Sequence, residues 1–197
     1  MRKDILICGV GGQGTVLASR ILAAAAMAEG YPVHSAETIG MAQRGGSVTS
    51  HVRIGEGAYA PLIPFGSADL ILAFEPAEAV RSLKYLRPGG LAVVNTVPTP
   101  PVTESLRPTG YNGAEMISWL QTRCACIPVD AADVCRPFGS SKFLNIILLG
   151  IVSGSGCLGL RSDSLLQQIE KNVPARFLEQ NLAAFRAGSD IGKKAVR

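Results

Sequence analysis

"GVGGQGTVLASR" (residues 9–20) joins an apolar run to an alanine-rich segment, and this junction decides the fold. Residues 5–8 before it are apolar, which is typical of a buried strand. Residues 15–29 after it favour a helix. From Gly9 onward the glycines follow the spacing G-x-G-x-x-G, which lets backbone N–H groups at a helix start approach a phosphate. The stretch therefore predicts a strand, a glycine loop and a helix, as at the start of an α/β domain.

Predicted strands and helices alternate along the rest of the chain. Apolar and polar residues alternate over 47–54 with the period of a strand, and Glu75-Pro76 is typical of a helix start. This order predicts a three-layer α/β/α sandwich with a mostly parallel, Rossmann-like sheet and a helical C-terminal tail. We expect strands at 4–8, 32–36, 47–54, 70–74, 91–95 and 126–129, and helices at 15–29, 75–86, 115–123, 162–171 and 174–187.

No internal repeat and no linker divides the 197 residues. The chain is 47% hydrophobic, enough for one core, so we expect a single domain over 1–197. The C-terminal helices, from about 140 to 188, belong to that domain. The polar last ten residues are expected to fray.

The charge and composition narrow the classes of ligand and compartment. The net charge is +4, but the basic residues never form a block, which disfavours nucleic acid and favours a ligand with a few phosphates. The longest apolar run, 143–152, is too short to cross a membrane and contains Asn145. Five cysteines without framework spacing and the lack of a signal-peptide pattern predict a soluble, cytoplasmic protein.

Three interpretations of the glycine loop remain open. It is a tight turn without a ligand, a dinucleotide site, or a site where the helix start holds another phosphate. A dinucleotide site would need an acidic residue about 20 residues further on, and Glu37 lies near that place. No lysine follows the loop in a G-K-[ST] arrangement, which excludes a P-loop NTPase. Gly11 and Gly14 are expected to hold backbone that a Cβ atom would obstruct.

A second glycine-rich stretch, "ETIGMAQRGGSVTSHVRIG" (residues 37–55), follows the second predicted strand. Its Arg44 carries a guanidinium group that suits phosphate or carboxylate, and its glycine pair permits close backbone approach to a ligand. Both glycine segments should lie at the same edge of the sheet. They could converge on one anion with the side chains of Gln13, Arg20, Gln43 and Arg44.

The remaining reactive residue types favour structural roles. His34 and His51 have no partnered serine, cysteine or aspartate motif, and His51 is expected on the polar face of its strand. Trp119 is expected in the core. Cys124 and Cys126 form only a C-x-C pair and are interpreted as thiols rather than a metal site. We therefore predict no catalytic residue and no metal site on this chain.

Four stretches together resemble one family: "GVGGQGTVLASRIL", "GMAQRGGSVTSHVRIG", "LKYLRPGGLAVVNTVPTPPVT" and "KFLNIILLGIVSG". The chain is similar to the gamma-domain family of 2-oxoacid:ferredoxin oxidoreductases, and within it to the beta subunits of indolepyruvate enzymes. The resemblance runs in order from about residue 3 to residue 188. Thr38-Ile39 departs from the valine and histidine that relatives carry there, so the 2-oxoacid stays open.

The resemblance implies a division of labour. Thiamine diphosphate, magnesium and iron–sulfur clusters would belong to a larger partner subunit, and this chain has neither a G-D-G…N motif nor a C-x-x-C-x-x-C run. The chain would have no activity alone. With its partner it would cap the active site while an arylpyruvate is decarboxylated, electrons pass to ferredoxin, and coenzyme A takes the acyl group. Whether the isolated chain forms a homodimer stays open.

Coenzyme A is the phosphate-bearing ligand that the resemblance implies for the two glycine segments. The two alternatives are a separate NAD- or FAD-binding Rossmann oxidoreductase and a scaffold subunit that touches no ligand. The residues expected to hold the phosphates are Gly11, Gly12, Gln13, Gly14, Arg20, Gln43, Arg44, Gly45 and Gly46.

Overall fold

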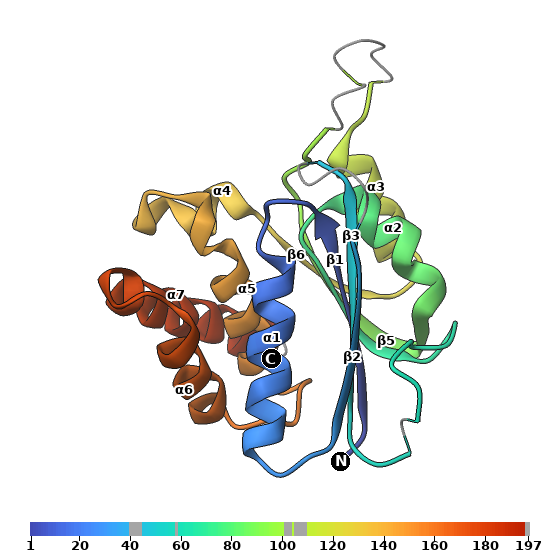
Figure 1. Cartoon of the computed structure of the whole chain (residues 1–197). Helices are drawn as coiled ribbons and strands as arrows, with labels where there is room; N and C mark the ends of the chain where they lie inside the picture. Colours follow the sequence, from blue (N-terminus) through green and yellow to red (C-terminus); the bar gives the residue numbers. More distant parts are fainter. Residues whose placement is uncertain (40–44, 58, 101–103, 105–109, 196–197) are drawn as a thin grey trace.

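The computed structural model describes residues 1–39, 45–57, 59–100, 104 and 110–195. Six strands form one sheet in the order β2-β3-β1-β4-β5-β6 (Figure 1). β3 runs antiparallel to both of its neighbours, and the other neighbouring pairs are parallel. This confirms the mostly parallel sheet. The strands are β1 (Lys3–Val10), β2 (Val33–Ile39), β3 (Ser47–Ile54), β4 (Ala68–Ala73), β5 (Leu86–Asn95) and β6 (Ala125–Val129).

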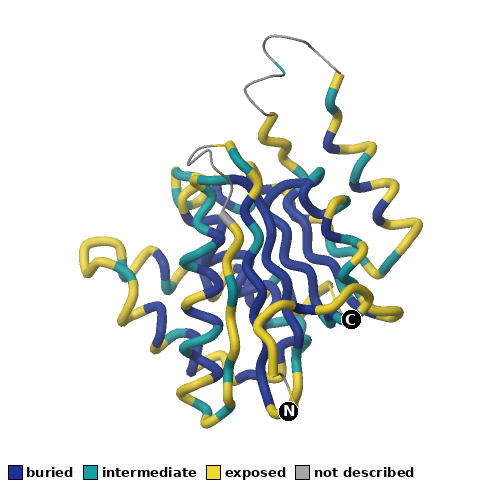
Figure 2. The backbone as a smooth tube through the Cα atoms, turned by 45° about the vertical axis from the view of Figure 1, so that its right-hand side comes forward, coloured by how far each residue is buried: buried dark blue, intermediate teal, exposed yellow. Residues whose placement is uncertain are grey.

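Helices cover both faces of the sheet, as predicted (Figure 1). Alternate residues of β1 point to opposite sides: Ile5 and Ile7 pack with α1 and α5, whereas Leu6 and Cys8 pack toward α2 and α3. The central strands β1 and β4 are therefore buried on both faces, and Figure 2 shows the centre of the sheet as buried, whereas the described residues of edge strand β2 are intermediate or exposed. The helices are α1 (Thr15–Ala28), α2 (Pro76–Ser82), α3 (Gly113–Gln121), α4 (Ala131–Cys135), α5 (Leu144–Gly154), α6 (Ser162–Asn172) and α7 (Ala175–Ala195).

The helix predicted over 75–86 is shorter in the structure. Glu75 caps it as its sequence suggested, because its side chain accepts a hydrogen bond from the Glu78 N–H group. α2 ends at Ser82, and a 3₁₀ turn (Leu83–Tyr85) leads into β5. Residues 87–90 were expected only to stop the helix. They lie inside β5, where its pairing with β4 shifts register.

The C-terminal tail differs from the prediction that it frays. α7 continues to Ala195 because its last turns pack closely on α5. A methyl group at Gly188 would collide with the Ile147 carbonyl oxygen, and one at Gly192 with the Ile151 carbonyl oxygen. The glycines thus let two helix backbones approach each other, and this contact holds the polar tail in a helix.

α5 is apolar because it lies in the core, where residues 144–153 are all buried. Within the described ranges, no single helix is long and apolar enough to cross a bilayer. Only the pair Ala131–Phe138 and Ser141–Gly154, bent by 106°, reaches that length and composition together.

Trp119 is exposed, so its expected place in the core is wrong. α3 turns Ile117 and Leu120 toward the sheet, which leaves the indole on the outer face with 41% of its surface exposed. The Arg123 guanidinium lies over the ring at 5.3 Å. Helix position, rather than side-chain size, decides its exposure.

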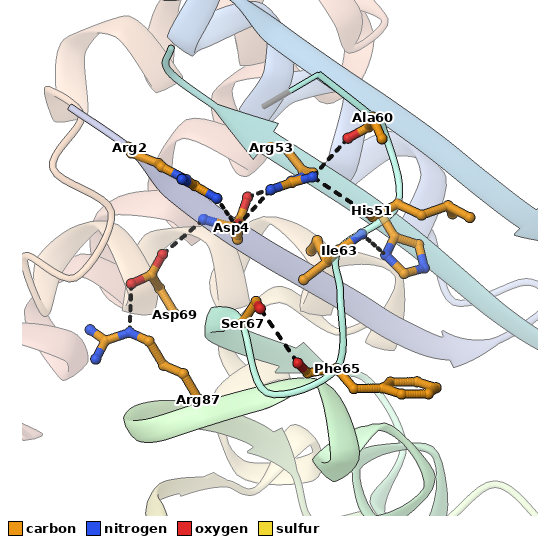
Figure 3. Close-up of polar contacts among 11 residues, drawn as sticks. Arg2, Asp4, His51, Arg53, Ala60, Ile63, Phe65, Ser67, Asp69 and Arg87 are labelled. Atoms are coloured by element: carbon orange, nitrogen blue, oxygen red, sulfur yellow. Dashed lines mark hydrogen bonds and ion pairs between the residues drawn. The ribbon is translucent and has the colours of Figure 1, made fainter. Parts of the chain in front are cut away.

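A buried ion pair fixes the edge of the sheet where β1 begins (Figure 3). Arg53 Nε donates to Asp4 Oδ1 at 2.8 Å, and Arg53 Nη2 to Oδ2 at 3.2 Å. Arg53 Nη1 also donates to the Ala60 and Leu62 carbonyl oxygens, which holds the loop after β3 against the sheet. His51 is buried, not on a polar face, and its Nδ1 accepts a hydrogen bond from the Ile63 N–H group. This edge is a structural support for the sheet.

Candidate functional site

The glycine loop lies between β1 and α1, at the carboxyl edge of the parallel strands (Figure 1). Gly12 and Gly14 adopt φ angles of +101° and +83°, which residues with a Cβ atom disfavour. Gly11 is not among the positive-φ glycines, so the positive φ angle falls at Gly12 instead, and close approach at Gly11 stays a prediction. Gly14 occupies the cap position of α1 and offers no side chain to the first helical turn. That turn therefore presents N–H groups that a ligand can use.

Gln13 fastens the loop rather than projecting toward a ligand. Its Oε1 accepts a hydrogen bond from the Val10 N–H group at 2.9 Å. Its Nε2 donates to the Phe74 carbonyl oxygen at 3.0 Å and to Thr99 Oγ1 at 3.3 Å. Both amide protons are engaged within the protein. The predicted phosphate contact from the Gln13 side chain therefore lacks a free donor.

The two glycine segments meet in the structure. The Gly11 N–H donates to the Gly46 carbonyl oxygen at 2.8 Å, and the Gly45 N–H donates to the Gly11 carbonyl oxygen at 3.3 Å. These bonds continue the antiparallel pairing of β1 with β3 beyond the strand ends. Gln43 and Arg44 lie outside the described residues, and their expected phosphate contacts stay predictions.

A cavity of about 340 Å³ opens at the start of α1. Three of the predicted residues, Gly12, Gln13 and Gly14, line it, whereas Arg20 is exposed on α1 and is not a lining residue. No acidic side chain is among its described lining residues. The other lining residues come from the ends of β5, α4 and α5 and their connections: Asn95, Val97, Thr99, Ala131, Ser141, Lys142, Leu144 and Asn145.

A larger cavity, of about 710 Å³, is acidic and was not predicted from the sequence. Gly45 lines it together with four glutamates and Arg81. Glu75 accepts a hydrogen bond from the Tyr111 hydroxyl, and burial together with this bond raises the pKa of Tyr111. Glu78 accepts one from Ser47 Oγ at 2.7 Å and pairs with Arg81. The only sequence signal was Glu75-Pro76, which we interpreted as a helix start.

Glu37 does not occupy the place that a dinucleotide site requires. In dinucleotide-binding sheets the second strand lies beside the first, so its acidic residue faces the glycine loop. Here β3 lies between β1 and β2. Glu37 Oε1 instead accepts a hydrogen bond from Ser19 Oγ at 3.0 Å. The strand order thus disfavours NAD or FAD at this loop.

The cysteines are free thiols in environments that oppose ionisation. Burial raises the pKa of Cys8 to about 12. Burial and the neighbouring Cys124 raise the pKa of Cys126 to about 11. Over the part of the chain that the structure describes, no group of three or more His, Cys, Asp or Glu side chains is placed to hold a metal. None of these thiols is poised as a nucleophile.

Residues 4–191 match the family model described as pyruvate ferredoxin/flavodoxin oxidoreductase, and the chain belongs to this family. It is a small subunit of a 2-oxoacid:ferredoxin oxidoreductase. The chain is 38% identical over 190 residues to indolepyruvate oxidoreductase subunit IorB of Methanothermobacter thermautotrophicus, covering 95% of this chain and 96% of that one. These findings confirm the resemblance that the motifs indicated.

Two solved structures share the fold. The gamma subunit of a keto/oxoacid ferredoxin oxidoreductase from Geobacter sulfurreducens has a TM-score of 0.72 at 22% identity, covering 98% of this chain and 99% of that chain. A 2-oxoglutarate:ferredoxin oxidoreductase from Magnetococcus marinus has a TM-score of 0.75 at 20% identity. That match covers 98% of this chain and 31% of the longer one. The same fold therefore occurs as a separate subunit and as part of a longer chain.

Proposed function

We propose that this chain is the cytoplasmic small subunit of an enzyme that oxidatively decarboxylates an arylpyruvate such as indolepyruvate. It forms one domain, caps the active site and holds the phosphates of coenzyme A at the start of α1. The observation that carries the proposal is the uncapped start of α1, which opens on a cavity without described acidic lining residues. Water exclusion by the cap would protect the reactive intermediate.

The relatives support both the assignment of the substrate and the assignment of coenzyme A. The subunit from Methanothermobacter is named for indolepyruvate. The Magnetococcus enzyme was solved with coenzyme A and succinyl-CoA bound. Thiamine diphosphate, magnesium and iron–sulfur clusters are assigned to a larger partner subunit, which would supply the carbanion and electron-transfer chemistry and reduce ferredoxin. The residues of this chain would bind and orient coenzyme A and shield the reactive intermediate from water.

Reconstitution with the partner subunit tests the assignment. The purified chain should not oxidise indolepyruvate, whereas the complex should do so with coenzyme A and ferredoxin. Turnover by the single chain would refute the division of labour. A purified chain that retains a yellow flavin would favour an FAD-binding oxidoreductase instead.

Arg44 offers the sharper kinetic test, because its guanidinium is the predicted partner of a coenzyme A phosphate. Losing a charge-assisted hydrogen bond of about 1.5–3 kcal/mol corresponds to roughly 10- to 150-fold in affinity. Arg44→Ala in the complex should raise the KM for coenzyme A by that factor and leave the KM for the 2-oxoacid unchanged. A raised 2-oxoacid KM alone would make Arg44 a substrate clamp. Loss of subunit association alone would place it in the interface.

Hydrogen exchange separates this proposal from a ligand-free scaffold. Coenzyme A added to the complex should protect amides of residues 11–17 in this chain. The segment 162–172, on α6 and away from the glycine loop, is the internal control. Equal exchange of both segments with and without coenzyme A would favour a scaffold.

A further inference from the structure

We propose that the cavity at the start of α1 binds a phosphate group, and that Lys142 and Asn145 are the side chains that hold it. The inference deepens the proposed function and rests on it for the identity of the natural ligand, coenzyme A. Neither residue belongs to the two glycine segments. Both follow α4 in sequence and reach the cavity from the start of α5.

Asn145 is a largely buried residue whose amide donor faces the cavity without an acceptor from the described part of the chain. Only 6% of its surface is exposed, although it lines the cavity. Its Oδ1 accepts a hydrogen bond from the Ile146 N–H group at 2.9 Å, which fixes the orientation of the amide. Its Nδ2 therefore points toward the glycine loop and lies 2.7 Å from the position that a Cβ atom at Gly14 would take. Among the described residues no acceptor receives a hydrogen bond from this Nδ2.

The other two side-chain amides that line the cavity differ from Asn145, because their donors have acceptors within the chain. Asn95 Nδ2 donates to the Phe74 and Val97 carbonyl oxygens, and Gln13 Nε2 also has two acceptors. These two side chains are saturated within the fold. Among the described side-chain amides that line the cavity, Asn145 is thus the one whose donor remains available to a ligand there.

The backbone and Lys142 add positive potential around the same space. The first hydrogen bond within α1 is donated by the Ala18 N–H to the Gly14 carbonyl oxygen, so the N–H groups of residues 15–17 have no acceptor inside the helix. Lys142 lines the cavity and forms no ion pair with any described residue. A helix start, an ammonium group and an amide donor together match the several acceptor oxygens and the negative charge of a phosphate.

The volume limits what part of a ligand fits. About 340 Å³ is at the low end of ligand pockets, which span roughly 300–1,000 Å³. The cavity therefore suits a phosphate or diphosphate group with the rest of the ligand outside. Coenzyme A and free inorganic phosphates share this chemistry, and the experiment must distinguish them.

Calorimetric titration of the full-length chain with sodium pyrophosphate tests the site directly. Pyrophosphate should bind, and Lys142→Gln should weaken binding by roughly 10- to 150-fold. Asn145→Asp should weaken it at least as much, because it replaces the donor with a negative charge and keeps an oxygen that can accept from the Ile146 N–H group. Lys171→Gln is the matched control, since Lys171 is also exposed but lines none of the cavities described. It should leave the affinity unchanged.

The outcomes separate this inference from the proposed function. Absence of pyrophosphate binding, or equal affinity of wild type, Lys142→Gln and Asn145→Asp, would overturn the phosphate site. If Asn145→Asp does not fold by circular dichroism, exposed Lys142 decides alone. In the complex, Lys142→Gln should raise the KM for coenzyme A by a similar factor. Lost pyrophosphate binding with an unchanged coenzyme A KM would keep the site, assign it to another phosphate and refute the coenzyme A assignment.

Discussion

Replacing Gly14 with alanine tests how rigidly the glycine loop is held against α5. Two separate costs arise. The φ angle of +83° is left-handed, which costs a residue with a Cβ atom about 1–2 kcal/mol. The new methyl group would lie 2.7 Å from Asn145 Nδ2 and 3.2 Å from Asn145 Cγ, and such overpacking typically costs about 1–3 kcal/mol. We expect Gly14→Ala to lower the free energy of unfolding by about 2–5 kcal/mol.

Gly12→Ala isolates the backbone cost. Its φ angle is also positive, at +101°, but a Cβ atom there would meet nothing within 4 Å. This variant should therefore lose only about 1–2 kcal/mol. Urea unfolding followed by circular dichroism measures both losses, with an unchanged m-value as the sign that the comparison is valid.

The contact with Asn145 can be assigned by a double-mutant cycle. Asn145→Ala removes the group that the methyl would strike, so Gly14→Ala should cost about 1–3 kcal/mol less in that background. Equal destabilisation by Gly14→Ala and Gly12→Ala, with no coupling to Asn145, would refute the reasoning. The amide would then move aside without cost, and the loop would not be held by α5.

Three further predictions concern the rest of the fold. Asp4→Ala should lower the free energy of unfolding by about 3–5 kcal/mol in urea titrations, because it leaves the Arg53 guanidinium buried without its partner. Burial, with a smaller contribution from Arg53, lowers the pKa of His51, so the folded state binds this proton less readily than the unfolded chain. Stability from neutral His51 should be complete above about pH 6.5 and decline as the pH falls below it, and His51→Gln should flatten this part of the pH profile. Cys8 and Cys126, with pKa values raised to about 12 and about 11, should react with iodoacetamide at pH 7.5 far more slowly in the folded than in the urea-unfolded chain, as measured by mass spectrometry.

Local sequence patterns were sufficient to predict most of the sheet. β3 matches its predicted bounds, and α1 is within a residue of its predicted end, because strand alternation and a glycine stop act over a few residues. Strand order depends on contacts between distant segments, so the sequence did not reveal that antiparallel β3 separates β1 from β2. That order removes Glu37 from the glycine loop and brings the second glycine segment to it.

The candidate site was only half predictable for a related reason. The glycine spacing identifies the backbone side of the cavity, since a turn needs particular residue types at fixed positions. The opposite side comes from Lys142 and Asn145, which are far from the loop in sequence. The sequence did single out Asn145, because it is the polar residue within the apolar run 143–152. Its amide points to a site only when the structure shows that it lines a cavity and that its donor has no acceptor among the described residues.

The electrostatics of the two cavities determine which side of the glycine loop an anion can use. Thr99 lines both cavities, its hydroxyl accepts from Gln13 and its N–H donates to Glu75 at 3.4 Å. These two hydrogen bonds hold Thr99 between the two cavities. The carboxylates of buried Glu75 and Glu78 on one side would repel a phosphate. The start of α1 and Lys142 attract it on the other side. Among the described residues, the side of the loop that favours a phosphate is therefore the cavity where the unpartnered amide of Asn145 lies.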